Sequence, residues 1–371
     1  MPRNTRKLSF LFVSLVTLFL SVNANARPRT LNTDVVVVGT GASGLAASVS
    51  AAESGGKVIA LEKLAVTGVS SAFAEGMFAV QTDEQKMLFM DYTPEEMFRK
   101  AMEVSQGYKV NPSLIMKYIT ESTATIAWLK KQGLGFKPAR TMPGEPQVWH
   151  LVQEYNGRHL GSALVTRMAD RAEELGVKIM LETPGKKLIV ENGVVKGVEA
   201  VDKRGNKVIV NAGAVIIATG GFPGSKEKIR KWTSFDPDVI ETFIPLEKTG
   251  DGIDMAMEVD GKLVGTGMMV APLFKDEFVP LVNQTWALQW ENNLWVNKYG
   301  DRFIDETMVY NFVFGGNVIE AQPGSFAWSV FDEQTLELLE TKGSRTGAGG
   351  FIAPLTKLTE VRKEMEQAVQ K

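Results

Sequence analysis

The sequence predicts an α/β fold with a parallel sheet, a helical insert and an antiparallel β-meander, followed by the start of a second, α+β domain. Three observations predict it. The four valines Val35–Val38 show no polar alternation, as in a strand buried on both faces. A glycine-rich turn, an Ala-rich segment and a second apolar run at Lys57–Leu61 then complete a strand-turn-helix-strand unit. Further on, short apolar runs broken by tight turns are typical of antiparallel strands.

The first predicted domain spans residues 31–267. Its helical insert, at about 85–176, contains Thr93-Pro94-Glu95-Glu96, which combines an N-cap, a proline at the first helical position and a capping-box glutamate. Asn111-Pro112 opens a further helix, and Ser162–Leu175 is another. The meander, at about 177–211, leads into a buried strand at Ala214–Ala218. Residues 268–371, with irregularly spaced tryptophans, are expected to form a capping or substrate domain that is incomplete.

The N-terminus has the three parts of a secretory signal. Arg3, Arg6 and Lys7 are a positive start, Leu8–Val22 is apolar, and Ala24-Asn25-Ala26 is a small-x-small cleavage site. The alternative is a membrane anchor, but about 15 apolar residues are fewer than the roughly 20 that span a bilayer. Residues 1–26 are therefore expected to be a cleaved signal peptide, with export to the bacterial periplasm and no membrane span afterwards.

Composition excludes several classes of function. The formal net charge is -2 and the sequence pI is about 6.0, so there is no basic field for nucleic acid. There is no cysteine, which excludes disulfides, thiolate catalysis and thiolate metal sites. The only histidines are His150 and His159, so no histidine-rich metal centre is expected. Both are expected at surface or capping positions, with a catalytic role as the alternative, for which His159 is the better candidate.

The glycine-rich turn suits the diphosphate of a dinucleotide. Gly39-Thr40-Gly41-Ala42-Ser43-Gly44 is G-x-G-x-x-G directly after a buried strand and at the start of a helix, which defines a Rossmann-like unit. The N-terminus of that helix supplies unpaired N–H groups and partial positive charge. Glu62 ends the next strand, where its carboxylate can accept hydrogen bonds from ribose hydroxyls and disfavours a 2′-phosphate. The loop alone does not separate NAD from FAD, and the later meander favours FAD.

Several motifs in one order resemble the flavoproteins of the fumarate reductase and succinate dehydrogenase superfamily, nearest to its soluble exported branch with flavocytochrome c and urocanate reductases. Between residues 34 and about 335 these motifs are V-V-V-V-G-T-G-A-S-G, the Glu62-Lys63 pair, W-L-K-K-Q-G at Trp128–Gly133, H-L-G-S at His159–Ser162, A-T-G-G-F at Ala218–Phe222, T-G-D-G at Thr249–Gly252 and W-V-N-K-Y-G-D-R-F-I-D-E at Trp295–Glu306.

The resemblance implies FAD as the cofactor and no metal. It assigns Gly39, Gly41, Ser43 and Gly44 to the pyrophosphate, Glu62 to the adenosine ribose, Ala218, Thr219 and Gly220 to the length of the dinucleotide, and Asp251 to its flavin end. Lys63, Ser70 and Gly76 complete the expected cofactor-binding residues. From the residues alone, Asp251 between two glycines is also explained as a turn residue. Arg302 and Glu306 are expected to form an ion pair or turn device, and Trp295 to be a core residue.

The sequence departs from the family in three places. Val69 and Glu75 stand where glycines are usual near the flavin. Ala271 and Tyr310 stand where fumarate reductases have a histidine and a proton-donating arginine, so Tyr310 is the candidate general acid, with a packed aromatic residue as the alternative. The closing segment of the family is not found after Lys371.

The expected function is an exported FAD-dependent oxidoreductase that transfers hydride between flavin N5 and an activated alkene or a saturated carbon of a small organic substrate. With few residues before the first strand, electrons are expected from a separate donor such as a small cytochrome. Two alternatives stay open. One is an inactive remnant that at most binds FAD, and the other is an NAD-dependent dehydrogenase using only the first loop.

Overall fold

The computed structural model describes residues 28–68, 70–105, 110–139, 146–240, 247–266, 284, 288, 291, 293–310, 312–345 and 355–369. The expected signal segment, residues 1–26, lies outside them. Within the described ranges, no helix has both the length and the apolar character to cross a membrane.

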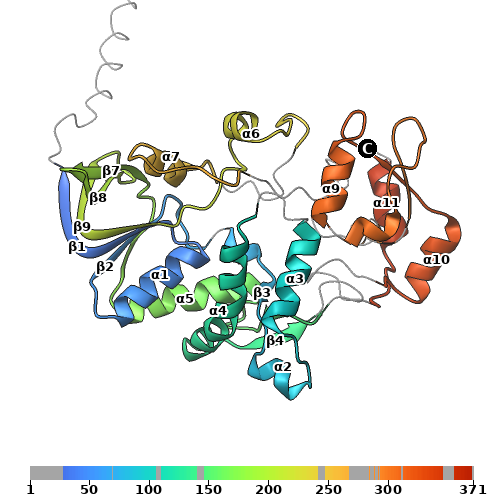
Figure 1. Cartoon of the computed structure of the whole chain (residues 1–371), viewed down its shortest axis with the longest axis horizontal. Helices are drawn as coiled ribbons and strands as arrows, with labels where there is room; N and C mark the ends of the chain where they lie inside the picture. The colour runs from blue at the N-terminus through green and yellow to red at the C-terminus, as the bar shows by residue number, and fades with distance from the viewer. Residues whose placement is uncertain are drawn as a thin grey trace, which may run out of the picture.

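A six-stranded mixed sheet forms the first part of the molecule, with the order β6-β2-β1-β9-β8-β7 (Figure 1). Its strands β6, β2, β1 and β9 are parallel, whereas β9, β8 and β7 are antiparallel. The strands are β1 Arg29–Val38, β2 Val58–Leu61, β6 Lys178–Met180, β7 Gly185–Glu191, β8 Val194–Val201 and β9 Lys207–Ile217. The expected α/β class with a parallel sheet and a meander is confirmed.

Two hydrophobic cores lie on opposite faces of this sheet, because successive side chains of a strand point to opposite sides. Val37 of β1 packs with α1 (Ala42–Glu53) and α5 (Leu160–Glu174), which cover one face (Figure 1). Val36 and Val38 pack instead with residues of the meander and with Met255 of α7 (Asp251–Met257). The unbroken valine run is thereby explained, since β1 is buried on both faces.

The meander differs from its expected extent at both ends. The prediction placed its first strand at residue 177, but β6 pairs parallel with β2 in the main sheet. The prediction also separated the last meander strand from the buried strand at 214–218. In the structure β9 is one strand that pairs with β8 at its start and with β1 along its length. The extent of the meander depends on strand pairing between segments far apart in sequence, and local turn signals carry no information about that pairing.

The insert is helical but also holds a small sheet that the sequence reasoning missed. Its helices are α2 Asp83–Met87, α3 Pro94–Ser105 and α4 Pro112–Lys131. The strands β3 Gly76–Phe78, β5 Trp149–Val152 and β4 Phe136–Ala139 form an antiparallel sheet in that order. Each is three or four residues long, too short for a clear alternation pattern. The expected helical insert at about 85–176 thus contains the strands β4 and β5 in addition to its helices.

The chain from residue 293 onward builds a separate apolar core. Its elements are β10 Leu294–Val296, the 3₁₀ helix η2 Glu306–Tyr310, α9 Phe312–Glu320, β11 Trp328–Val330, α10 Glu333–Thr341 and α11 Val361–Val369. Trp295 is 3% exposed and packs with Leu336, Leu339 and Leu358, which confirms its expected core position. The helices of this part lie at the opposite end of the molecule from the six-stranded sheet (Figure 1). The domain boundaries stay predictions.

Candidate functional site: the carboxyl ends of β1, β2 and β9

The glycine loop between β1 and α1 is shaped by backbone contacts that side chains would block. Gly39 has φ +100°, and a Cβ on it would lie 2.4 Å from the Ala218 carbonyl oxygen. A Cβ on Gly44 would lie 1.9 Å from the Gly39 carbonyl oxygen, so only glycine lets α1 start this close to the strand end. A Cβ on Gly41 would have Ser71 Oγ as its nearest neighbour, at 3.3 Å. The loop therefore presents bare backbone to any group that approaches the start of α1.

The N-terminus of α1 offers amides to an anion. Gly41 is the N-cap residue, and the first backbone hydrogen bond of the helix runs from Leu45 N to Gly41 O. The amide of Ala42 donates to Ser71 Oγ at 2.9 Å. Among the described contacts no protein acceptor is seen for the amides of Ser43 and Gly44, and the first turn carries no acidic side chain. Those two amides are placed to bind a phosphate oxygen.

Ser71 lies against the glycine loop, and the sequence reasoning missed it. The prediction chose its neighbour Ser70, which precedes the 3₁₀ helix η1 (Ser71–Phe73) and makes no side-chain cap bond there. Ser71 Oγ lies against Gly41 and Ala42 instead. The signal in the sequence is the Ser-Ser pair itself, but which serine faces α1 depends on the turn between β2 and β3. The role of Ser70 in cofactor binding stays a prediction.

Glu62 is held in place by the glycine loop. The residue is 9% exposed, and its Oε2 accepts hydrogen bonds from Thr40 N at 2.9 Å and Thr40 Oγ1 at 2.7 Å. Its Oε1 accepts from Leu64 N at 3.0 Å. A carboxylate has about four acceptor positions, so three bonds orient it and one position remains for a ribose hydroxyl. Thr40, fully buried, was an unassigned position of the motif in the sequence reasoning.

Lys63 and Asp251 meet across 188 positions of sequence. Lys63 Nζ donates to Asp251 Oδ2 at 3.1 Å and to Thr249 Oγ1 at 3.0 Å, and Glu247 Oε2 lies 3.7 Å away. Thr249 Oγ1 in turn donates to Asp251 Oδ1 at 2.5 Å. Partial burial raises the pKa of Asp251, but the bonds from Thr249 and Lys63 outweigh it and lower the pKa overall. A charged Asp251 therefore joins the end of β2 to the start of α7.

The end of β9 lies beside the glycine loop. Ala218 N donates to Val38 O at 2.8 Å, and the Ala218 carbonyl faces Gly39. Thr219 Oγ1 accepts from Gly252 N at 3.1 Å, which ties the strand end to α7. Gly220 has φ +78° and is exposed, so the chain turns there without a side chain. The structure thus gathers ten of the predicted cofactor-binding residues: Gly39, Gly41, Ser43, Gly44, Glu62, Lys63, Ala218, Thr219, Gly220 and Asp251.

Gly76 has a structural explanation in strand pairing. A Cβ on it would lie 2.2 Å from the His150 carbonyl oxygen, because β3 and β5 pair there.

His150 was expected at a surface or cap and is instead fully buried. Its Nε2 lies 2.8 Å from Thr82 Oγ1 and its Nδ1 lies 3.2 Å from Val148 O. Burial lowers the pKa of His150, so it is a neutral core residue. His159 is the exposed N-cap residue of α5 and makes no side-chain cap bond.

The catalytic prediction falls at the edge of what the structure describes. Tyr310 is the last residue of η2, and the position of its side chain lies outside the described residues, as do Val69 and Ala271. The expected ion pair between Arg302 and Glu306 is confirmed. Arg302 Nη2 donates to Glu306 Oε2 at 2.6 Å, and Glu306 Oε1 accepts from Trp295 N at 3.2 Å. Within the described ranges no group of three or more acidic or histidine side chains gathers to hold a metal ion.

Comparison with known proteins identifies the family. A family model described as an FAD binding domain matches residues 34–336. The chain belongs to this family. It is 31% identical to vinyl phenol reductase of Lactiplantibacillus plantarum, with 91% of this chain and 69% of the relative covered. It is 30% identical to fumarate reductase (cytochrome) of Shewanella frigidimarina, with 86% and 55% covered. The resemblance to the fumarate reductase and succinate dehydrogenase superfamily is confirmed.

Solved structures agree on the fold. A flavocytochrome c3 fumarate reductase in its open conformation has a TM-score of 0.63 and 27% identity, covering 83% of this chain and 54% of that chain. A 3-ketosteroid-Δ4-(5α)-dehydrogenase of Rhodococcus jostii has a TM-score of 0.70 and 24% identity, covering 85% and 71%, and shows the fold alone. The cofactor of the family is FAD, and the bare glycine loop, the two open α1 amides and the oriented Glu62 fit its diphosphate and ribose.

Proposed function

We propose that this chain binds FAD at the carboxyl ends of β1, β2 and β9 and catalyses the FAD-dependent reduction of an activated carbon–carbon double bond. The observation that carries the proposal is the cradle of Gly39, Gly41 and Gly44 beside Glu62, in a chain matched by the family model over residues 34–336. The reductases among its relatives support this reaction class. The chain spans 55% of the fumarate reductase, so activity of the whole protein is part of the proposal.

The proposed substrate is a conjugated alkene without two carboxylates. Reduction of a dicarboxylate needs cationic side chains that bind carboxylates in bidentate fashion, as a guanidinium does and a phenol cannot. By resemblance, Tyr310 stands at the place of such an arginine. A vinyl phenol reductase is among the relatives at 31% identity, which supports an uncharged aromatic alkene. Fumarate is expected to be a poor substrate.

The residues divide the work between binding and proton supply. FAD, when bound, supplies the two-electron redox chemistry. Glu62 and the α1 amides hold the adenosine and diphosphate end, and Lys63 with Asp251 fixes the approach of β2 and α7. Tyr310 is proposed to donate a proton from its hydroxyl to one alkene carbon and to regain it from solvent. Electrons come from a separate reductant, for which we propose a small cytochrome, and export to the periplasm is proposed from residues 1–26.

The test is turnover by the FAD-loaded chain with a chemically reduced viologen dye as electron donor. 4-Vinylphenol should be reduced to 4-ethylphenol with a kcat/KM at least tenfold above that for fumarate. Tyr310→Phe should lower kcat by about 10²- to 10⁴-fold while the FAD content, read from its absorbance, stays unchanged. FAD binding without reduction of any alkene would favour the non-catalytic alternative. Turnover with NADH in protein free of flavin would favour a nicotinamide-dependent dehydrogenase.

A further inference from the structure

Helix α2 in the insert has an inverted pattern of burial. Its fully buried residue is Gln85, whereas Met87, Leu88 and Phe89, at and just after its C-terminal end, are 71%, 52% and 98% exposed. A surface helix normally buries its apolar side chains and exposes its polar ones. Single exposed apolar residues are common, but three in succession form a contiguous patch. Such patches mark contacts with another molecule or with a membrane.

Hydrogen bonds inside the molecule hold α2 in place. The side-chain amide of Gln85 donates to the carbonyl oxygens of Ala79 and Gln147, at 3.2 and 2.9 Å. Gln85 Oε1 accepts from Thr82 N at 3.1 Å, as one half of a capping box. Thr82 Oγ1 in turn lies 2.8 Å from Nε2 of the buried His150. The fold therefore supports α2 through buried polar groups and holds residues 87–89, the apolar tip, in solvent.

The turn after α2 puts Phe89 in a left-handed conformation. The Phe89 amide donates to Lys86 O at 3.0 Å, and the Met90 amide donates to Gln85 O at 2.9 Å. These two bonds define a Schellman motif, in which glycine is preferred at the position that Phe89 occupies with φ +56°. An aromatic residue is strained at this φ, and the exposed side chain of Phe89 gains no packing in return. Folding does not explain this residue, whereas a contact outside the chain does.

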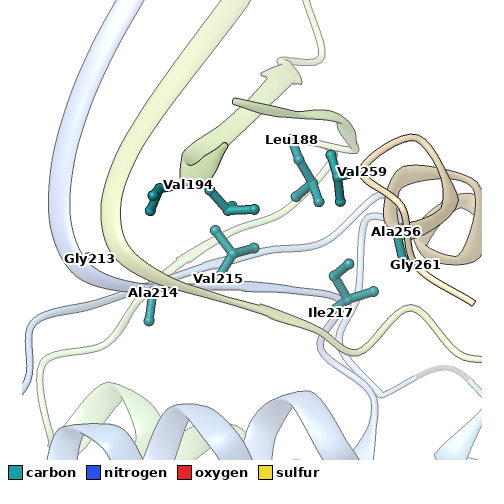
Figure 2. A pocket seen from close by; sticks show the side chains of 10 residues that line it. Leu188, Val194, Gly213, Ala214, Val215, Ile217, Ala256, Val259 and Gly261 are labelled. Atoms are coloured by element: carbon teal, nitrogen blue, oxygen red, sulfur yellow. The ribbon is translucent and has the colours of Figure 1, made fainter. Parts of the chain in front are cut away.

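The apolar tip is convex. In Figure 1, α2 lies at the lower edge of the molecule, below β4. Successive helical residues point about 100° apart, so Met87 and Leu88 diverge. The apolar groove of about 490 Å³ between the meander and α7 is the opposite case, since the side chains of Val215, Ile217 and Leu188 converge there (Figure 2). A protein would need a matching pocket to cover diverging side chains, whereas fluid hydrocarbon surrounds them without one.

Lysine side chains lie around this end of the molecule. Lys86 belongs to α2, Lys130 and Lys131 to the last turn of α4, and Lys137 to β4, which packs against α2. Lys86 and Lys130 pair with carboxylates of α2 itself. Among the described contacts, the exposed Lys131 and Lys137 have no acidic partner, and the exposed Asp91 offsets only part of their charge. Lysines beside an apolar insertion are attracted to the phosphates of lipid headgroups.

We propose that the apolar tip inserts into the surface of a phospholipid bilayer, with Lys131 and Lys137 at the level of the headgroup phosphates. Three side chains bury a small apolar area, so the attachment is peripheral and reversible. A second copy is a poorer partner, because two convex tips with diverging side chains cover little of each other. The attachment is independent of the proposed reaction.

The test is co-sedimentation of the purified chain, supplied with FAD, with vesicles of phosphatidylethanolamine and phosphatidylglycerol. The chain used begins at Arg27, because the apolar segment Leu8–Val22 would itself bind lipid. It should bind the vesicles, and Phe89→Gly should lower the partition coefficient at least tenfold. Phe89→Trp should bind at least as tightly as the unmodified chain, since tryptophan is favoured at the membrane interface. Lys131→Glu combined with Lys137→Glu should weaken binding at least threefold.

Leu355→Gly is the matched control. Leu355 is also apolar, 72% exposed and at a positive φ of +66°, but it belongs to the part of the chain after residue 293. This variant should bind vesicles like the unmodified chain. Phe89→Gly should keep or raise the melting temperature, because glycine is preferred in the left-handed position of the turn. Its weaker binding would then not be due to unfolding.

Two results would overturn the proposal. The first is absence of vesicle binding, or binding that Phe89→Gly or the double lysine variant leaves unchanged, or that Leu355→Gly weakens equally. The second is association without lipid that grows with protein concentration and is lost in Phe89→Gly, which would make a second copy the partner. Neither readout depends on alkene turnover, so failure here leaves the proposed reaction untouched.

Discussion

Single residues in this chain act through the contacts they make with loops far away in sequence. Glu62 is the clearest case, because three hydrogen bonds from Thr40 and Leu64 orient its carboxylate before any ligand arrives. A preoriented acceptor loses less entropy when a ribose hydroxyl binds. Thr40 therefore orients the carboxylate that we propose for ribose binding, although the two glycines on either side of it are the more obvious part of the motif.

His150 gives a residue-scale prediction about pH. Burial lowers its pKa, against smaller opposing effects of the Val148 carbonyl and Glu84. Below the ordinary pKa of about 6.5 the unfolded chain binds a proton that the folded chain does not, so the free energy of unfolding falls as pH falls. One such proton changes it by at most about 1.4 kcal/mol per pH unit. Urea unfolding of His150→Gln between pH 7.5 and 5.0 should show a shallower decline than the unmodified chain.

His159→Gln is the control for that experiment, because its side chain is exposed at the N-cap of α5. It should keep the pH profile of the unmodified chain. An acid-induced decline that is equally steep in His150→Gln would show that other groups cause it.

At the scale of elements, the start of α1 lies close to the end of β1 because Gly44 has no side chain. Gly44→Ala would place a Cβ 1.9 Å from the Gly39 carbonyl oxygen, which is backbone and cannot move aside. We expect Gly44→Ala to lower the free energy of unfolding by about 1–3 kcal/mol and to weaken FAD binding, because the start of α1 must shift. Chemical denaturation and an FAD titration measure both effects. Gly221→Ala is the matched control, since its Cβ would meet only Pro223 at 3.6 Å. Equal stability of the two variants would contradict the close approach.

At the scale of the whole molecule, FAD at the proposed site would contact three strand ends that are far apart in sequence. A ligand that binds only the folded state stabilises it by about 2.7 kcal/mol at one hundred times its Kd. FAD should therefore raise the melting temperature by several degrees. FMN lacks the adenosine and the second phosphate that Glu62 and the α1 amides are placed to hold, so FMN should raise the melting temperature much less than FAD does. An equal shift by NAD and FAD would favour the nicotinamide alternative, and no shift by FAD would refute the site.

Local patterns in the sequence were sufficient for the parts of the molecule that depend on neighbouring residues. The valine run, the G-x-G-x-x-G turn and Glu62 identified β1, the start of α1 and the end of β2, because burial on both faces and steric space for backbone leave a direct trace in residue type. The family match over residues 34–336 confirms the fold class that followed from them, and it confirms FAD, which the meander and the family resemblance had favoured over NAD.

Only the tertiary structure determined the strand pairings and side-chain contacts between segments that are far apart in sequence. The continuity of β9, the parallel pairing of β6, the choice of Ser71 over Ser70 and the bond from Lys63 to Asp251 all join segments well separated in sequence. Hydrogen bonding and packing between such segments are set by the whole arrangement of chain, and no local pattern carries that information. The point along β9 where pairing with β8 stops belongs to the same class, because β9 stays apolar beyond Asn211 and only the register of the sheet shows the change.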